Sequence, residues 1–176
     1  MQFQGGTADS SSRVLVVDDE EPIRRVLCRL LNRNGYVCEA AADADEALRA
    51  LKEDVYELVL TDMDMPGSSG LDLIMRILAD FPDTATVMVT GMDDTNLANT
   101  ALEIGAYGYI IKPFEPNEIL ISVSNALRRR GLEIENRNHR ARLEQMVLAD
   151  QLVEGLRTQP ISEGLPDRGA GAPGGC

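Results

Sequence analysis

A short apolar stretch that ends abruptly in an aspartate constrains this chain more than any other feature. Residues 58–60 are Leu-Val-Leu, Thr61 and Asp62 follow, and residues 65–70 read Met-Pro-Gly-Ser-Ser-Gly. Proline fixes φ and glycine accepts positive φ, so residues 65–70 favour a turn. We therefore predict a buried strand over 58–61 that delivers Asp62 to its carboxyl end.

The same arrangement occurs three more times. Residues 13–17, 86–89 and 109–111 are also apolar runs that stop at polar side chains. The polar residues that follow the four runs are Asp18, Asp19, Asp62, Thr90 and Lys112. Open parallel sheets place their sites beyond the carboxyl ends of the strands. If the four strands are parallel neighbours, these five side chains converge on one pocket.

Apolar residues at helical spacing separate the strands. The first helix begins at Glu20-Glu21-Pro22 and ends near Asn34-Gly35, and Asp43 is placed to cap the second. One of Asp93, Asp94 and Thr95 caps the fourth helix, and Pro116 begins the fifth. The predicted apolar faces are Ile23, Val26, Leu27, Leu30 and Leu31; Ala47, Leu48 and Leu51; Leu71, Ile74, Met75 and Leu78; Leu97, Ala101 and Ile104; and Ile119, Leu120, Val123 and Leu127.

A further short strand over 36–40 completes the pattern. Strands and helices then alternate five times, which predicts an α/β fold with a parallel sheet, right-handed crossovers and helices on both faces. The formal net charge of -12 argues against non-specific binding of nucleic acid. The three cysteines fit neither a disulfide framework nor a zinc site, so we expect reduced thiols in a cytoplasmic protein.

The chain divides into four predicted parts. Residues 1–12 are a disordered lead without the features of a secretory signal, and 13–127 form the domain. Residues 128–157 are rich in Arg, Glu and Leu and predict a helical extension, and the Gly/Pro-rich tail 158–176 is disordered. No apolar run is long enough for a membrane span.

Two interpretations of the helical extension stay open. Leu132, Leu143, Met146 and Val153 fall roughly on a heptad seam, which favours a short coiled coil that dimerises or transmits a signal. Asn136, His139 and Asp150 interrupt that seam. The other interpretation is a solvated continuation of the last domain helix.

The predicted pocket has the chemistry of phosphoryl transfer. Asp18, Asp19 and Asp62 would repel one another unless a cation shares the site, and an all-oxygen set suits a hard ion such as Mg²⁺. A carboxylate can also take a phosphoryl group as a nucleophile. Lys112 offers a cation and Thr90 a hydroxyl donor for the phosphoryl oxygens.

These motifs together resemble the receiver domain of two-component response regulators. The matching residues are Val14-Leu15-Val16-Val17-Asp18-Asp19-Glu20, Leu60-Thr61-Asp62 with Met65-Pro66 and Gly70, Val89-Thr90-Gly91, and Lys112-Pro113-Phe114. The resemblance spans about residues 13–127. It implies a flavodoxin-like, doubly wound sheet of five parallel strands in the order 2-1-3-4-5.

The resemblance also implies site roles. Asp62 is the implied phosphoacceptor; Asp18, Asp19, Asp62 and the backbone carbonyl of Asp64 hold Mg²⁺, for which Mn²⁺ could substitute. Lys112 binds the phosphoryl group, Thr90 is the switch hydroxyl, Tyr109 is the coupled aromatic switch, and Pro113 follows a cis peptide bond. The side chains of Asp64 and Met92 occupy positions that tune phosphoryl lifetime in this family.

The implied protein is a signalling switch and not a turnover enzyme. Its expected partners are a sensor histidine kinase or phosphotransfer protein, and a downstream protein or an output domain that the chain has lost. Homodimers could form through the last domain helices or the helical extension, and neither direct nucleic-acid binding nor a membrane is expected. The stretch after residue 127 also resembles linker helices of larger regulators, including ones with HD-type phosphodiesterase domains.

Two other functions fit part of the sequence. Asp62-Met63-Asp64 matches the paired aspartates of haloacid-dehalogenase-like phosphatases, in which Asp64 would be the general acid/base. Against this, the pair follows the third strand and a Pro/Gly turn comes at once. A flavin-binding module shares the strand order, but the Asp-Asp-Glu after the first strand would repel phosphate unless a metal is present.

Overall fold

The computed structural model describes residues 11–91 and 93–157 of the 176-residue chain. Predictions about residues 1–10, Met92 and residues 158–176 lie outside this part. The elements in order are β1 Arg13–Val17, α1 Glu21–Arg33, β2 Val37–Ala41, α2 Ala44–Glu53, β3 Leu58–Asp62, β4 Asp64–Met65, β5 Ser68–Ser69, α3 Gly70–Asp80, β6 Ala85–Gly91, α4 Thr95–Ile104, β7 Gly108–Lys112 and α5 Pro116–Arg157.

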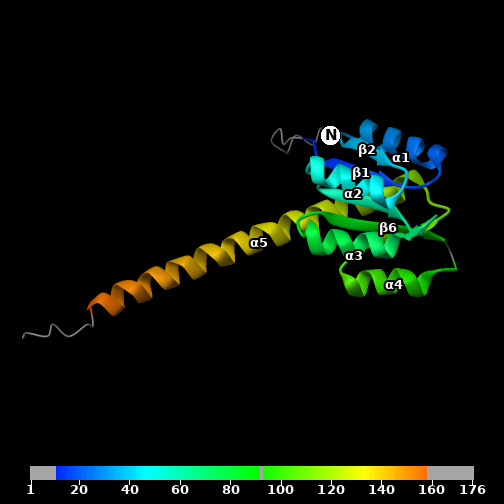
Figure 1. Ribbon diagram of the computed structural model, residues 1–176. Helices are drawn as coiled ribbons and strands as arrows, with labels where there is room; N and C mark the ends of the chain where they lie inside the picture. The colour runs from blue at the N-terminus through cyan, green and yellow to red at the C-terminus, as the bar shows by residue number, and fades with distance from the viewer. Residues whose placement is uncertain (1–10, 92, 158–176) are drawn as a thin grey trace, which may run out of the picture. The chain divides into compact units, whose positions relative to one another are not determined.

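The main sheet has five parallel strands in the order β2-β1-β3-β6-β7 (Figure 1). The predicted 2-1-3-4-5 order is therefore confirmed. Register aligns the carboxyl ends of the inner strands, since Val17 pairs with Thr61 and Asp62 pairs with Val89. The residues at the carboxyl ends of β1, β3 and β6 consequently lie together at one edge of the sheet.

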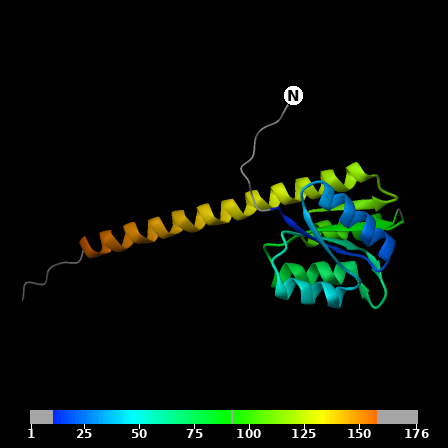
Figure 2. The same ribbon diagram turned by 90° about the horizontal axis from the view of Figure 1, so that it is seen from above.

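Helices cover both faces of the sheet, as predicted. Alternate strand residues point to opposite faces, so Val14 and Val16 pack with α1 and α5, whereas Leu15 and Val17 pack with α2 and α3. Figure 2 shows α1 and the start of α5 on one side and α2 on the other. Every residue of β3 is buried because helices cover the sheet on both faces, which accounts for the apolar residues from Leu58 to Leu60.

The predicted apolar faces of α1 and α3 are wrong in part. Val26 is 59% exposed and Met75 is 51% exposed. The buried stripe of α1 runs through Leu27 and Leu31, and that of α3 runs through Leu73 and Ile77. Each helix contacts only one face of the sheet, so apolar residues one helical step outside the stripe remain in solvent.

The turn after β3 is a small hairpin. Asp64 pairs with Ser69 and Met65 with Ser68, and the connecting Gly67 has a φ of 82°. That left-handed conformation favours glycine. Ser69 then caps α3 by accepting a hydrogen bond from the Asp72 backbone N–H.

The caps of α2 and α4 differ from each other. Asp43 caps α2, as predicted, by accepting a hydrogen bond from the Glu46 backbone N–H. Asp94 precedes α4 without a side-chain capping bond. The apolar side chains near the two ends of α4 are partly exposed to solvent, since Leu97 and Ile104 are each 36% exposed.

Helix α5 is continuous from Pro116 to Arg157. The chain divides into two compact units, and the boundary between them in the sequence follows Asn136. Within the first unit, Ile119 and Val123 are fully buried in the core. The side chains of residues 137–155 in the second unit are exposed. No helix in the described ranges is both long and apolar enough to cross a lipid bilayer.

Candidate functional site

Three carboxylates meet at the carboxyl edge of the sheet. Carboxylate oxygens of Asp18, Asp19 and Asp62 all lie within 4.8 Å of one another. Asp18 and Asp62 are 2% and 6% exposed, whereas Asp19 is exposed. The carboxyl end of β1 and the last residue of β3 thus bring together the acids that the sequence placed after separate strands.

Lys112, at the end of β7, extends over this acidic cluster. Its Nζ lies 3.2 Å from Asp62 Oδ1 and 3.5 Å from Asp18 Oδ2. The peptide bond from Lys112 to Pro113 is cis. One ammonium therefore contacts the two buried carboxylates of the cluster.

Asp18 is held by contacts that the sequence pattern did not indicate. The Glu20 backbone N–H donates to Asp18 Oδ1 at 2.9 Å, and the Arg24 guanidinium donates to the Asp18 carbonyl oxygen at 2.6 Å. The Asp18 N–H donates to the carbonyl of Ala41 at 3.2 Å. Arg24 and Ala41 thereby fix the Asp18 backbone, and the Glu20 N–H orients its carboxylate.

The electrostatic balance of the site favours an added cation. Burial raises the pKa of Asp62, and the nearby Asp18 carboxylate raises it further, against the opposing effect of Lys112. Burial lowers the pKa of Lys112, but Asp62 and Asp18 together outweigh it and leave that pKa raised. Asp62 is thus a carboxylate whose charge Lys112 does not fully compensate.

The donor set fits a hard divalent cation. In residues 11–91 and 93–157, the Asp19 side chain has no hydrogen-bond or ion-pair partner, although it belongs to the acidic cluster. Oxygen ligands of this kind, completed by water, are what Mg²⁺ prefers. Asp64 lies two residues beyond Asp62 in β4, and its side chain is exposed.

Thr90 occupies the carboxyl end of β6, beside β3. The residue is 1% exposed, and among the described residues its hydroxyl has only a long contact, 3.5 Å, to the carbonyl oxygen of Gly91. The hydroxyl is therefore held without a strong hydrogen bond that a new acceptor would have to break. Met92 falls outside the described residues.

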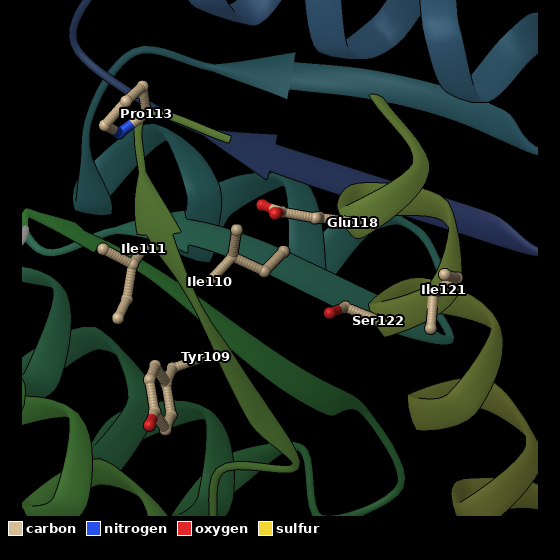
Figure 3. A pocket seen from close by; sticks show the side chains of 7 residues that line it. All are labelled: Tyr109, Ile110, Ile111, Pro113, Glu118, Ile121 and Ser122. Carbon is tan, nitrogen blue, oxygen red and sulfur yellow. The ribbon is translucent and has the colours of Figure 1, made fainter. Parts of the chain in front are cut away.

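Tyr109 lies on β7 and borders a different pocket. A cavity of about 500 Å³ is lined by residues of β7 and the first turns of α5 (Figure 3). Tyr109 and Ile111 project to one side of the strand and Ile110 to the other. Tyr109 is 37% exposed, so it presents an aromatic ring at the surface.

Gly70 supports the site in a way that the motif alone did not reveal. A Cβ placed on Gly70 would lie 2.2 Å from the carbonyl oxygen of Asp62 and 3.0 Å from the Cα of Met63. The Gly70 N–H also donates to the carbonyl of Met63 at 2.9 Å. Glycine is required because the start of α3 packs directly on the backbone that carries Asp62.

Comparison with known proteins agrees with this geometry. Residues 14–124 match the response regulator receiver domain. The C4-dicarboxylate transport transcriptional regulatory protein DctD of Rhizobium meliloti (strain 1021) is 37% identical over 127 residues, which cover 72% of this chain and 28% of DctD. The chain spans about half or less of the length of the curated relatives that it matches.

Solved structures show the same similarity. A receiver domain protein from Clostridium thermocellum has 33% identity and a TM-score of 0.66, covering 69% of this chain and 98% of that one. The signal receiver domain of an HD domain-containing protein from Pseudomonas fluorescens Pf-5 has 30% identity and a TM-score of 0.69, covering 76% and 98%. With the five-stranded sheet and the acidic cluster at its edge, these matches establish that the chain belongs to the response regulator receiver family.

Proposed function

We propose that Asp62 accepts a phosphoryl group from a sensor histidine kinase or a histidine phosphotransfer protein. The observation that carries this proposal is the acidic cluster itself: three carboxylates within 4.8 Å, two of them contacted by one lysine. In the transfer, an Asp62 oxygen attacks phosphorus and the bond from phosphorus to the donor imidazole breaks. The product is an acyl phosphate on Asp62 and a neutral histidine on the donor.

Asp18, Asp19, Asp62 and the Asp64 backbone carbonyl would hold Mg²⁺, or Mn²⁺ in its place. A bound divalent ion supplies positive charge to the phosphoryl oxygens and reduces their repulsion of the attacking carboxylate. Lys112 already lies 3.2 Å from Asp62 Oδ1 and supplies a second positive charge to the same group. Asp18 and Asp19 would serve as metal ligands and would not themselves take the phosphoryl group.

Thr90 is the proposed switch residue. Within residues 11–91 and 93–157 its hydroxyl has no strong partner, so it would donate to a phosphoryl oxygen on the neighbouring strand. This bond forms only with the phosphorylated state, so it shifts an existing equilibrium between two arrangements. Thr90 pairs with Ile111 of β7, and Tyr109 lies two residues earlier on the same strand. Tyr109 would therefore change its position at the surface when Thr90 binds the phosphoryl group.

We assign signal output to the face formed by α4, β7 and the start of α5. Exposed apolar groups gather there, including Leu97, Ile104, Tyr109 and Ile121, and the cavity of Figure 3 lies between β7 and α5. The acceptor of the signal is a downstream protein, an output domain or a second copy of the chain. Residues 128–157 extend α5 and would transmit the change as a helix or short coiled coil.

Mass spectrometry of the intact protein tests the phosphoacceptor role. Wild-type protein is incubated with Mg²⁺ and acetyl phosphate beside Asp62→Ala and a matched control, Asp72→Ala, which removes an acid at the start of α3. We expect one phosphoryl adduct in the wild type and the control, none in Asp62→Ala, and none after chelation. Steady phosphate release without an adduct would instead support the phosphatase alternative that uses Asp62 and Asp64.

The Asp64 side chain is proposed to set phosphoryl lifetime, together with Met92. Asp64 is exposed beside the acceptor, so it can place a negative charge or orient a water near the acyl phosphate. We expect Asp64→Asn to change the rate of adduct loss after removal of acetyl phosphate. An unchanged rate would rule out this role and leave Asp64 as a surface acid.

A further inference from the structure

Two cysteines outside the acidic cluster lie on neighbouring elements and pack against the same part of the core. Cys28 lies in α1 and Cys38 in β2, and the Cys38 N–H donates to the side chain of Asn32, one helical turn beyond Cys28, at 2.9 Å. Neither is in a disulfide, and both are partly exposed. They pack against the same face of the core, beside Leu27, Leu31 and the β1 valines. The fold therefore brings together two cysteines that are separated in the sequence by the end of α1, a turn and the start of β2.

The surroundings distinguish the two sulfurs. Cys38 is fixed because its N–H donates to Asn32 Oδ1 at 2.9 Å and its Sγ lies 3.6 Å from the Glu39 carbonyl oxygen. The hydrogen bond from Cys38 lowers the pKa of the Cys28 thiol, burial opposes this, and Arg24 lowers the pKa further. The same hydrogen bond and burial raise the pKa of Cys38. Cys28 is thus the better nucleophile of the pair.

We propose that Cys28 and Cys38 form a redox-active dithiol site that reacts with small hydroperoxides and closes a disulfide between α1 and β2. The two cysteines lie across the contact between α1 and β2, both residues are partly exposed, and neither belongs to the phosphoryl site. No comparison or motif assigns them a role.

The reaction proceeds in two balanced steps. The Cys28 thiolate attacks one oxygen of hydrogen peroxide, the O–O bond breaks, and hydroxide leaves, which gives a sulfenic acid on Cys28. Cys38 loses its proton and attacks the Cys28 sulfur, and hydroxide leaves as the S–S bond forms. Two thiols are oxidised by two electrons, and the peroxide is reduced to two waters after the released protons combine with hydroxide.

The site joins the elements that hold Asp18. The Asp18 N–H donates to Ala41, the last residue of β2, and the Asp18 carbonyl accepts from Arg24, one turn before Cys28 in α1. A disulfide from Cys28 to Cys38 would cross-link these two elements, both of which contact the Asp18 backbone. The pair itself lies away from the phosphorylation site, because Cys38 pairs with Val14 near the start of β1 and Asp18 follows the end of that strand.

The test uses the full chain with Cys176→Ser, so that Cys28 and Cys38 are the remaining thiols. Reduced protein is treated with hydrogen peroxide, alkylated and measured by intact mass, and peptides are mapped. We expect loss of both alkylation sites, a cross-linked peptide pair from α1 and β2, monomeric protein, and recovery of both thiols with dithiothreitol. In Cys38→Ser, a dimedone adduct should appear on Cys28.

A parallel reaction in urea separates the effect of the fold from the effect of sequence proximity. Unfolded protein should form the cross-link several-fold more slowly, because the contact between α1 and β2 is lost. Thiols that stay alkylatable in folded protein, over-oxidation to sulfinic acid without a cross-link, or equal rates in folded and unfolded protein would each overturn the proposal. Circular dichroism of Cys28→Ala with Cys38→Ala confirms that loss of the thiols leaves the fold intact.

Discussion

Two groups of acids lie toward opposite ends of the strands and differ in how their charges are paired. The acidic cluster of Asp18, Asp19 and Asp62 at the carboxyl edge shares one lysine. Near the amino ends of β1 and β3, Arg13 pairs with Glu39 at 2.6 Å and with Asp54 at 3.3 Å. We call this second group the Arg13 cluster, which also includes Tyr56.

The Arg13 cluster satisfies its carboxylates within the chain. Glu39 accepts from both the Arg13 guanidinium and the Tyr56 hydroxyl, and the Arg13 guanidinium stacks 4.9 Å from the Tyr56 ring centroid. The carboxylates of the acidic cluster are instead crowded and under-compensated, and two of them are buried. The difference indicates that one group serves the folded chain itself, whereas the other is arranged for a cation and a phosphoryl group from outside.

The largest expected effect concerns the backbone beneath the acidic cluster. Gly70→Ala forces a Cβ against the Asp62 carbonyl, and the backbone must move. We expect a loss of about 2–4 kcal/mol in the free energy of unfolding, measured by urea denaturation. Gly131→Ala in α5 meets nothing within 4 Å and is the control, expected to be neutral or stabilising. Equal destabilisation by both variants would contradict the packing argument.

The next largest effect is expected from removal of Lys112, the cation that Asp18 and Asp62 share. Lys112→Met leaves Asp62 and Asp18 buried without their ammonium partner, so we expect a loss of about 1–3 kcal/mol in unfolding free energy without divalent ions. Mg²⁺ should restore part of that loss by replacing the missing charge. A variant that is as stable as the wild type in chelator would show that Lys112 does not compensate the cluster.

The Arg13 cluster should respond to pH and not to metal. The Tyr56 hydroxyl and then Arg13 lower the pKa of Glu39 below its ordinary value, so their stabilisation is present above that value and is lost as pH falls through the lowered pKa. We expect Tyr56→Phe to cost about 1 kcal/mol at neutral pH, with a gap to wild type that narrows in acid. Mg²⁺ should leave the gap unchanged. Tyr36→Phe, which removes a hydroxyl without a bonded partner in the described chain, is the control.

The smallest expected effect is a gain in stability. Within the described residues, the Thr86 hydroxyl in β6 is buried without a hydrogen-bond partner. Thr86→Val removes that unsatisfied group at nearly the same volume, and we expect a gain of about 0.5–1 kcal/mol in unfolding free energy. Thr84→Val is the matched contrast, because its hydroxyl donates to the Tyr56 carbonyl at 2.9 Å. A gain in both variants would mean that hydroxyl pairing does not decide stability here.

Much of the fold and the acidic cluster could be predicted from the sequence, because each apolar strand stops at a polar residue and parallel strands end at one edge. The rotation of each helix could not be predicted so well. An apolar stripe does not show which neighbouring residues stay in solvent, as Val26 and Met75 demonstrate. Contacts between distant segments, such as that of Arg24 with the Asp18 carbonyl, leave no local pattern at all.

Mg²⁺ titration by isothermal calorimetry tests the contrast between the clusters most directly. Wild-type protein is compared with Asp19→Asn, which removes the exposed acid of the acidic cluster, and with Asp54→Asn, which removes an acid of the Arg13 cluster. We expect Asp19→Asn to weaken Mg²⁺ binding by about tenfold or more, equivalent to about 1.4 kcal/mol, and Asp54→Asn to leave it unchanged. Equal affinities for all three proteins, or no Mg²⁺ binding by the wild type, would contradict the account.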